Sequence, residues 1–380
     1  MIIPFRKPNL DNKEKKEVLK VLNSSALTHG KYSKKFEDLF CKKFNYKYSL
    51  SVSSCTAALH LSYMALDLKK GDEVIVPNQT HVSTVHTCEI LGVKPIFIDC
   101  DKTTGNIDVN QIEAKITKKT KAITIVHFLG KPVDMDKILR ITKKYKLFLI
   151  EDCALSIGAK YKDKFIGSYG DFACFSFYPT KHITTADGGM LVCKSEKYYK
   201  KTKLLKGFGV DKNLNERKIP GNYDVKVVGL NYRMDEIRSA IGIHQLLKLD
   251  KFIKSREKNF HFIKDRISNI QNIRILETET TKNFKSSYFG ICIILDNKIK
   301  KRRFEIINEF KKLGIGTSIH YPRIVSDYTY YKKKYHLKRN RYKNACEISY
   351  NSFNLPVSPH LQQKDLEYIV KETKKIIRKY

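Results

Sequence analysis

Short apolar runs alternate with segments of helical spacing along the first half of the chain. Runs typical of buried strands lie at 73–77, 95–99, 122–126, 147–150, 172–177 and 189–193. Between them, apolar residues three and four positions apart predict helices at 56–66, 80–91 and 135–145. This alternation predicts an α/β fold with a mostly parallel central sheet and helices on both faces. Ligands of such sheets bind at the carboxyl ends of the strands.

The pattern changes in the second half of the chain. After a helix that starts near 196, a loop rich in Gly, Asn and Pro occupies 207–231, and a helix follows at 235–249. Further on come a long polar helix, a strand at 288–295, and helices at 303–313 and from 364 onward. We therefore expect a large domain at 1–250 and a smaller α+β domain at 251–380, with roughly the first 25 residues packed on the smaller one.

The chain is strongly basic. Its 380 residues include 73 Lys and Arg against 39 Asp and Glu, which gives a formal net charge of +34. Such a charge fits either a nucleic-acid surface or a solvated, lysine-rich exterior. The lysines are scattered without a patch of interleaved aromatic residues, which favours the second interpretation and predicts no specific nucleic-acid partner.

Membrane segments and bound metals are not expected. No apolar run reaches the roughly 18 residues of a membrane helix, and the amino terminus lacks the apolar stretch of a secretory signal, so we predict a cytoplasmic protein. Nine cysteines, with no C-x-x-C pair, lie partly within apolar runs. They predict buried reduced thiols instead of disulfides or a zinc site.

Two candidate chemical groups follow predicted strands. Asp152 ends a buried run, where its side chain would point into the ligand crevice, although the residue taken alone fits better as an aspartate that only caps the next turn. Lys181 follows the run at 172–177 and precedes a small, turn-forming segment. A lysine in that place can be desolvated, which lowers its pKa and makes it a nucleophilic amine. An ordinary surface lysine is the alternative.

A third group stands at the start of a predicted helix. Small hydroxyl residues at 51–56 lead directly into an apolar helical pattern. Free N–H groups and the helix dipole make such a start a phosphate site, although an ordinary helix cap uses the same residues. Amine, carboxylate and phosphate cradle together match pyridoxal phosphate, which needs a lysine for its aldehyde and an acid for its ring nitrogen.

Further motifs follow one another along nearly the whole chain. They lie at 26–30, 36–37, 71–77, 126–130, 151–152, 175–189, 229–234 and 320–322. In this order they resemble the sugar aminotransferase (DegT/StrS) family of fold-type-I pyridoxal-phosphate enzymes. Several spaced motifs are far more specific than any one of them.

The resemblance implies roles for individual residues. Lys181 resembles the lysine that forms a Schiff base with the cofactor, and Asp152 the partner of the ring nitrogen. The cofactor-binding residues implied in this way are Cys55, Thr56, His81, Asp152, Ser176, Lys181 and Asn231. Asn231 resembles an asparagine that reaches the phosphate from the other subunit, which implies a homodimer with shared active sites.

Some positions depart from the family pattern. His81 stands where an aromatic ring usually stacks on the cofactor, and Cys55 replaces the more usual Gly. Leu155 stands where Gln or His is common, so a polar contact to the cofactor or substrate is expected to be missing. The candidates for substrate binding are Tyr178, His182 and His320.

The implied activity is that of a pyridoxal-phosphate-dependent transaminase. The resemblance implies L-glutamate as the amino donor and a keto-sugar, nucleotide-linked, as the acceptor, in the synthesis of cell-surface polysaccharide or glycan precursors. One alternative is a sugar dehydratase, in which His replaces the lysine; here His182 stands beside Lys181 instead. The other is a non-catalytic, ligand-sensing regulator. The sequence leaves open which nucleotide, sugar and ring carbon are used.

Overall fold

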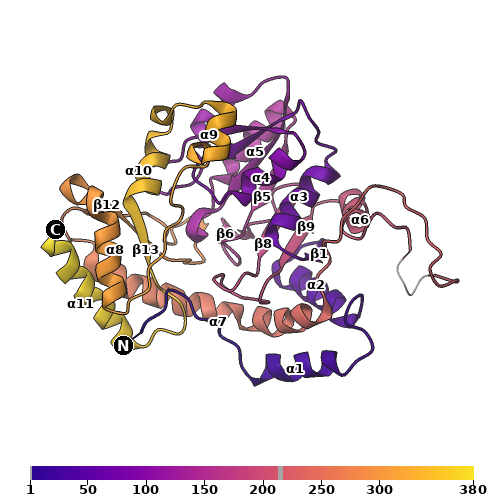
Figure 1. The fold of residues 1–380 in the computed structure, drawn as a ribbon, viewed down its shortest axis with the longest axis horizontal. Helices are drawn as coiled ribbons and strands as arrows, with labels where there is room; N and C mark the ends of the chain where they lie inside the picture. Colours follow the sequence, from indigo (N-terminus) through magenta and orange to yellow (C-terminus); the bar gives the residue numbers. More distant parts are fainter. Residues whose placement is uncertain (1, 213–216) are drawn as a thin grey trace.

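The computed structural model describes residues 2–212 and 217–380. At its centre is a seven-stranded sheet in the order β1-β9-β8-β5-β4-β2-β3 (Figure 1). Neighbours from β8 to β3 are parallel, whereas β9 runs antiparallel to both β8 and β1. The strands are β1 (Tyr48–Val52), β2 (Glu73–Pro77), β3 (Lys94–Ile98), β4 (Thr120–Val126), β5 (Phe148–Asp152), β8 (Phe172–Ser176) and β9 (Gly189–Cys193). The predicted α/β fold with a mostly parallel sheet is confirmed.

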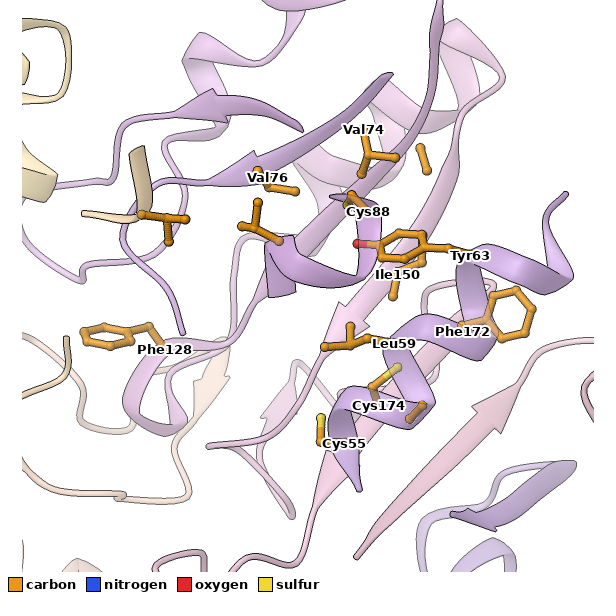
Figure 2. Packing of buried hydrophobic residues seen from close by; sticks show 14 of the residues in the cluster. Cys55, Leu59, Tyr63, Val74, Val76, Cys88, Phe128, Ile150, Phe172 and Cys174 are labelled. Atoms are coloured by element: carbon orange, nitrogen blue, oxygen red, sulfur yellow. The ribbon is translucent and has the colours of Figure 1, made fainter. Parts of the chain in front are cut away.

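Helices cover both faces of this sheet because its buried side chains alternate between the two. Val74 and Val76 of β2 share a core with Tyr63 and Cys88, which lie on two helices of one face (Figure 2). Ile75, between the two valines, belongs to a second core on the other face. The helices of the large sheet are α1 (Asn12–Leu22), α2 (Lys31–Phe44), α3 (Cys55–Ala65), α4 (Ser83–Ile90), α5 (Met135–Tyr145) and α6 (Glu196–Leu205).

A smaller antiparallel sheet with its own core lies in the C-terminal part. Its order is β10-β12-β13, and a further three-stranded sheet has the order β11-β6-β7. Ile3 pairs with Ile315 and is buried in the core of the first of these sheets. The elements are β6 (Lys160–Tyr161), β7 (Lys164–Phe165), β10 (Ile273–Ile275), β11 (Phe284–Lys285), β12 (Ile291–Leu295), β13 (Ser352–Leu355), α8 (Arg303–Lys312), α9 (Thr329–Tyr335), α10 (Lys343–Asn351) and α11 (Gln363–Lys379).

One helix, α7 (Glu236–Ile267), crosses from the large sheet to the small one (Figure 1). The sequence pattern predicts two helices that meet near residue 250, and this is wrong. Leu246, Leu249 and Phe252 are all buried and keep the helical spacing through that point without a proline to stop it. The division into domains at residue 250 stays a prediction.

Three smaller findings concern the start of a strand, the character of the helices and the cysteines. The strand predicted at 288–295 begins only at Ile291, because Tyr288 has a left-handed backbone with φ of 53° that cannot belong to an extended strand. Within residues 2–212 and 217–380, the helices lack the combination of length and apolar character that crossing a membrane requires. All nine cysteines are free thiols.

Candidate active site

A cavity of about 390 Å³ opens at the carboxyl ends of the parallel strands. It is lined by the loops that follow β1, β2, β5 and β8, which lie far apart in the sequence. Its described lining is Ser54, Cys55, Thr56, Thr80, His81, Ser83, Val126, Asp152, Ala154, Leu155, Ser176, Tyr178, Lys181, Asp187 and Tyr321. The structure thus brings together all but three of the residues that the sequence proposes for this site.

Lys181 projects its amine into this cavity from the loop after β8. Its backbone N–H donates to the carbonyl of Tyr178 at 2.9 Å, which fixes the turn. Nζ lies 5.6 Å from the centre of the Phe289 ring and forms no ion pair or hydrogen bond with the described residues. Burial lowers the pKa of Lys181, and the nearby Asp152 only partly opposes this. Burial therefore favours the neutral form of this amine more than in a lysine exposed to water.

Asp152 is the last residue of β5 and faces the same cavity. Its Oδ2 accepts a hydrogen bond from Thr84 Oγ1 at 2.9 Å, and its Oδ1 accepts one from the Ala154 backbone N–H at 3.0 Å. These two bonds fix the carboxylate plane. A carboxylate can accept about four hydrogen bonds, so Asp152 keeps acceptor capacity for a further donor in the cavity.

The start of α3 forms one end of the cavity. Ser54 caps the helix by accepting a bond from the Ala57 N–H at 3.1 Å, while the Thr56 hydroxyl is exposed and makes no hydrogen bond in the described part of the chain. A Cβ on Gly189 would lie 2.7 Å from the Cys55 nitrogen, so only glycine lets β9 approach the helix start this closely. With the Ser176 hydroxyl in the same lining, this helix start suits a phosphate.

His81 lies at the exposed side of the cavity. Its Nδ1 accepts a hydrogen bond from the Ser83 N–H at 3.2 Å, so the remaining ring proton of the neutral side chain is on Nε2. The Tyr321 ring packs against it with centres 5.5 Å apart. Burial and, to a lesser degree, the charge of Lys181 lower the pKa of His81. A neutral imidazole in this position can stack on a flat ring, whereas a protonated one would repel Lys181.

Three of the residues proposed from the sequence lie outside the lining. His182 turns away, and its Nε2 donates to the Ser287 carbonyl at 2.8 Å. The His320 ring packs edge-on against Phe289, and burial lowers the pKa values of His182 and His320 to about 4 and about 3. Asn231 is exposed on the segment after α6 and is not part of the cavity lining. Substrate binding by the two histidines stays a prediction.

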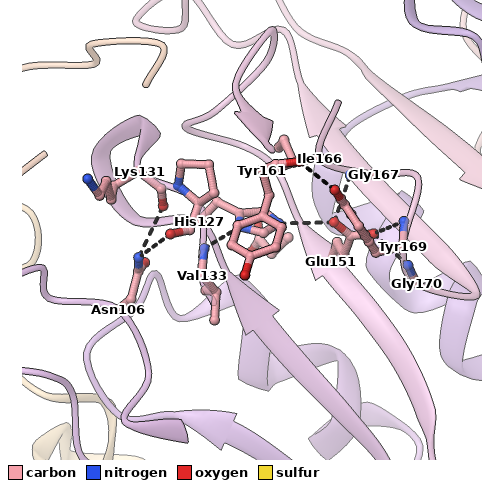
Figure 3. Close-up of polar contacts among 12 residues, drawn as sticks. Asn106, His127, Lys131, Val133, Glu151, Tyr161, Ile166, Gly167, Tyr169 and Gly170 are labelled. Carbon is pink, nitrogen blue, oxygen red and sulfur yellow. Dashed lines mark hydrogen bonds and ion pairs between the residues drawn. The ribbon is translucent and has the colours of Figure 1, made fainter. Parts of the chain in front are cut away.

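The residue before Asp152 serves the opposite face of the sheet. Glu151 accepts backbone N–H bonds from Gly167 at 2.7 Å, Tyr169 at 2.9 Å and Gly170 at 2.6 Å (Figure 3). Its fourth bond comes from His127 Nε2 at 3.0 Å, and His127 Nδ1 in turn accepts the Val133 N–H at 3.0 Å.

These bonds decide whether the same residues can hold a metal. Donor atoms of His127, Glu151 and Cys153 lie within 4.8 Å of one another, as in many metal sites. Both oxygens of Glu151 and both nitrogens of His127 are already used, and burial raises the pKa of the Cys153 thiol well above its ordinary value. The group is a hydrogen-bond network that stabilises the fold, not a set of free metal ligands.

Several residues of the site are missed by sequence reasoning. Thr80 and Thr84 flank His81 in the loop after β2 and at the start of α4, and Thr84 contacts Asp152 directly. Tyr321, not its neighbour His320, lines the cavity, and burial raises its pKa. Asp187 lies in the glycine-rich segment that follows Lys181. In the sequence these residues stand out only by lying next to a motif. That position does not tell which of two adjacent side chains faces the cavity.

The residues present fit pyridoxal phosphate. One cavity is surrounded by an amine and a helix-start hydroxyl that bond to none of the described residues, and by a carboxylate with spare acceptor capacity. Leu155, which is buried, makes part of the cavity wall apolar, at the position where the family commonly has Gln or His. Fold and site together define a pyridoxal-phosphate-dependent enzyme of the aminotransferase type.

Comparison with known proteins gives the family. The profile of the DegT/DnrJ/EryC1/StrS aminotransferase family matches residues 8–374, and the chain belongs to this family. GDP-perosamine synthase from Escherichia coli O157:H7 is 36% identical over 97% of this chain and 96% of its own length.

Solved structures agree with this assignment. The putative sugar aminotransferase Spr1654 from Streptococcus pneumoniae, in its PMP-form, superposes with a TM-score of 0.94 at 26% identity and 99% coverage of both chains. PseC from Helicobacter pylori, an aminotransferase of pseudoaminic acid biosynthesis, gives a TM-score of 0.93 at 28% identity, covering all of both chains. This chain is a pyridoxal-phosphate-dependent aminotransferase.

Proposed function

We propose that the enzyme transfers the amino group of L-glutamate to a nucleotide-linked keto-sugar, for a cell-surface polysaccharide or glycan precursor. A second cavity of about 720 Å³ carries the proposal. Among the described residues, its lining contains six cationic side chains and one acidic one, Glu37, which is already bonded to Ser51 and Lys206. The cations are Lys34, Lys203, Lys206, Lys212, Arg217 and Arg233. Such a cavity suits the diphosphate of a nucleotide sugar.

The chain's own residues have separate tasks in the reaction. Pyridoxal phosphate, when bound, takes up the amino group of the donor and draws electrons from the adjacent carbon. The Nζ of Lys181, with its lowered pKa, accepts the proton from that carbon. It then delivers the proton to the cofactor carbon that carries the amino nitrogen. Asp152 keeps the ring nitrogen protonated, and Thr56 and Ser176 hold the phosphate with the start of α3.

The same geometry favours transamination over dehydration. Lys181 lines the cavity, whereas His182 is turned toward Ser287. A dehydratase of this fold would need the histidine in the place of the lysine. A regulator that only senses ligands would not need a desolvated amine next to a carboxylate.

We further propose a homodimer in which each cavity is completed by the partner. The described parts of the segment after α6 extend away from the large sheet (Figure 1) and expose apolar side chains. These are Phe208, Ile219, Tyr223, Val225 and Val228, with exposed fractions from 49% to 85%. Asn231 ends the same segment, so a partner that covers it would receive this asparagine. We place the dimer in the cytoplasm, where glutamate and nucleotide sugars are made.

Half-reactions test the substrates. The purified, yellow enzyme should lose its colour with glutamate, because the cofactor then carries the amino group. A panel of nucleotide-linked 3-keto and 4-keto sugars should include one that restores the colour and yields the amino sugar by mass. Restoration by 2-oxo acids alone would contradict a sugar acceptor, and decolouration by another amino acid but not glutamate would contradict the donor.

Mixed dimers test the shared site. Lys181→Ala and Asn231→Asp each disable every site of their own homodimers. After mixing and exchange of subunits, one site of the hybrid has an intact lysine from one chain and an intact asparagine from the other. We expect activity to return on mixing, and no return would contradict the sharing.

A further inference from the structure

Two buried threonines, Thr80 and Thr84, form a hydrogen-bonded chain that ends on Asp152. Thr84 Oγ1 lies 2.9 Å from Asp152 Oδ2 and 2.8 Å from Thr80 Oγ1. Both threonines are at most 1% exposed, so water does not compete for these bonds. An ionised carboxylate can only accept, which means that Thr84 donates to Asp152 and Thr80 donates to Thr84. The three groups form a chain with a single direction.

The surroundings hold Thr84 in place. It lies in the first turn of α4, where its backbone N–H donates to the His81 carbonyl at 3.1 Å. The Tyr63 hydroxyl donates to the Thr84 carbonyl at 3.4 Å and contacts Thr124 Oγ1 at 2.6 Å. Strands β2, β4 and β5 and helix α3 thus all contribute to placing one hydroxyl. Packing alone does not require that this side chain be polar.

The bond has an electronic effect as well as a positional one. A hydrogen bond to a carboxylate stabilises its charged form and makes it a weaker base. We propose that Thr84, supported by Thr80, is a positioning residue that sets the orientation of Asp152 and compensates part of its negative charge, and through it influences the charge on the cofactor's ring nitrogen. The inference rests on the role proposed above for Asp152. It assigns the loop after β2 an influence on the reaction that does not involve contact with the substrate.

The direction of the effect follows from the charges. Without the Thr84 bond, the negative charge of Asp152 is less compensated and draws the shared proton away from the ring nitrogen. A less positive ring leaves the nitrogen that links Lys181 to the cofactor more basic. The yellow, protonated form of the resting enzyme would then persist to higher pH.

The experiment is a pH titration of the visible absorbance of the loaded enzyme without substrate. Thr84→Val keeps the shape and removes the hydroxyl, and we expect the midpoint to rise by about half a pH unit. Thr84→Ser should restore the parental midpoint, and Thr80→Val should shift it less in the same direction. Asp152→Asn is the reference and should shift it most.

The outcomes separate the inference from the function on which it rests. A parental midpoint in Thr84→Val, together with a large shift in Asp152→Asn, would overturn the role of Thr84 alone. No shift in Asp152→Asn would overturn both roles. Thr84→Val leaves the buried Thr80 hydroxyl without an acceptor, so this single variant could fold poorly. In that case the double variant Thr80→Val with Thr84→Val gives the same test. Its midpoint should equal that of Thr84→Val or lie higher.

Discussion

Two neighbouring acids at the end of β5 have opposite surroundings. Glu151 receives four hydrogen bonds on one face of the sheet, three of them from backbone N–H groups, and has no capacity left. Asp152, on the other face, receives two and lines the cavity. Strand geometry sends consecutive side chains to opposite faces, so one residue can secure the strand end while the next remains available for chemistry.

A second pair of neighbours repeats this division. Lys181 directs its amine into the cavity and bonds to no residue that the structure describes, whereas His182 is buried and bonded to the Ser287 carbonyl. Each pair combines a side chain that serves the reaction with one that serves the fold. Changes to the four residues should therefore separate into effects on activity and effects on stability.

Lys181→Ala should have the largest effect. Loss of the amine that moves the proton is expected to lower kcat by about 10⁴-fold. The melting temperature of the apo protein should not fall, because the variant removes a buried amine that makes no hydrogen bond within the described part of the chain. Stopped-flow absorbance with glutamate measures the first quantity and calorimetry the second. A destabilised but active variant would break the comparison.

Asp152→Asn should lower kcat by about 10²-fold, because an amide cannot hold the ring nitrogen in its protonated form. The fold should persist, since the Asn oxygen can still accept from Ala154 and the Thr84 hydroxyl can rotate to accept from the new amide. Steady-state kinetics and denaturant unfolding test both statements. A parental rate would remove the proposed role of this acid.

Glu151→Gln should do the reverse. The new amide group would face N–H donors that now point at a carboxylate, and no rotation of the side chain satisfies all four. We expect a loss of about 3 kcal/mol in the free energy of unfolding, while kcat per loaded site stays close to the parental value. Urea unfolding with absorbance-based counting of loaded sites measures the two separately. A stable but inactive variant would contradict the assignment of Glu151 to the fold.

His182 should give the smallest effect, confined to acid. Burial lowers its pKa to about 4, so below its ordinary value near 6.5 the unfolded chain binds a proton that the folded chain does not. Stability is therefore lost as the pH falls from 6.5 toward 4, by about 2 kcal/mol at pH 5. In His182→Gln this part of the acid dependence should disappear. An unchanged pH profile of unfolding would show that the histidine is not the group responsible.

The sequence was most informative where regular structure has a fixed period. Asp152 and Lys181 could be found because buried strands end just before them and point to one edge of the sheet. Tyr321 could not be chosen over His320, since irregular loops have no period that tells which neighbour faces inward. Thr84 was missed because its importance depends on a contact with Asp152, 68 positions away.

The continuity of α7 illustrates a different limit. A change from apolar to polar composition near residue 250 suggested a break, yet the buried stripe continues through it on one side of the helix. Composition reports on all sides of a helix at once, whereas packing concerns only one. Asn231 shows a third limit, because its proposed role in a partner's cavity cannot be read from its position in one chain, where it is an exposed loop residue.

In the proposed homodimer, the exposed apolar side chains on the segment after α6 have a cost before the two subunits meet. A newly synthesised chain that has folded but not yet met a second copy presents Phe208, Tyr223 and Val228 to water and to every other protein nearby. At low expression such lone subunits would dominate, and they would be the form that chaperones retain and that aggregates. Yield in recombinant production should therefore improve as the subunit concentration rises above the dissociation constant of the dimer.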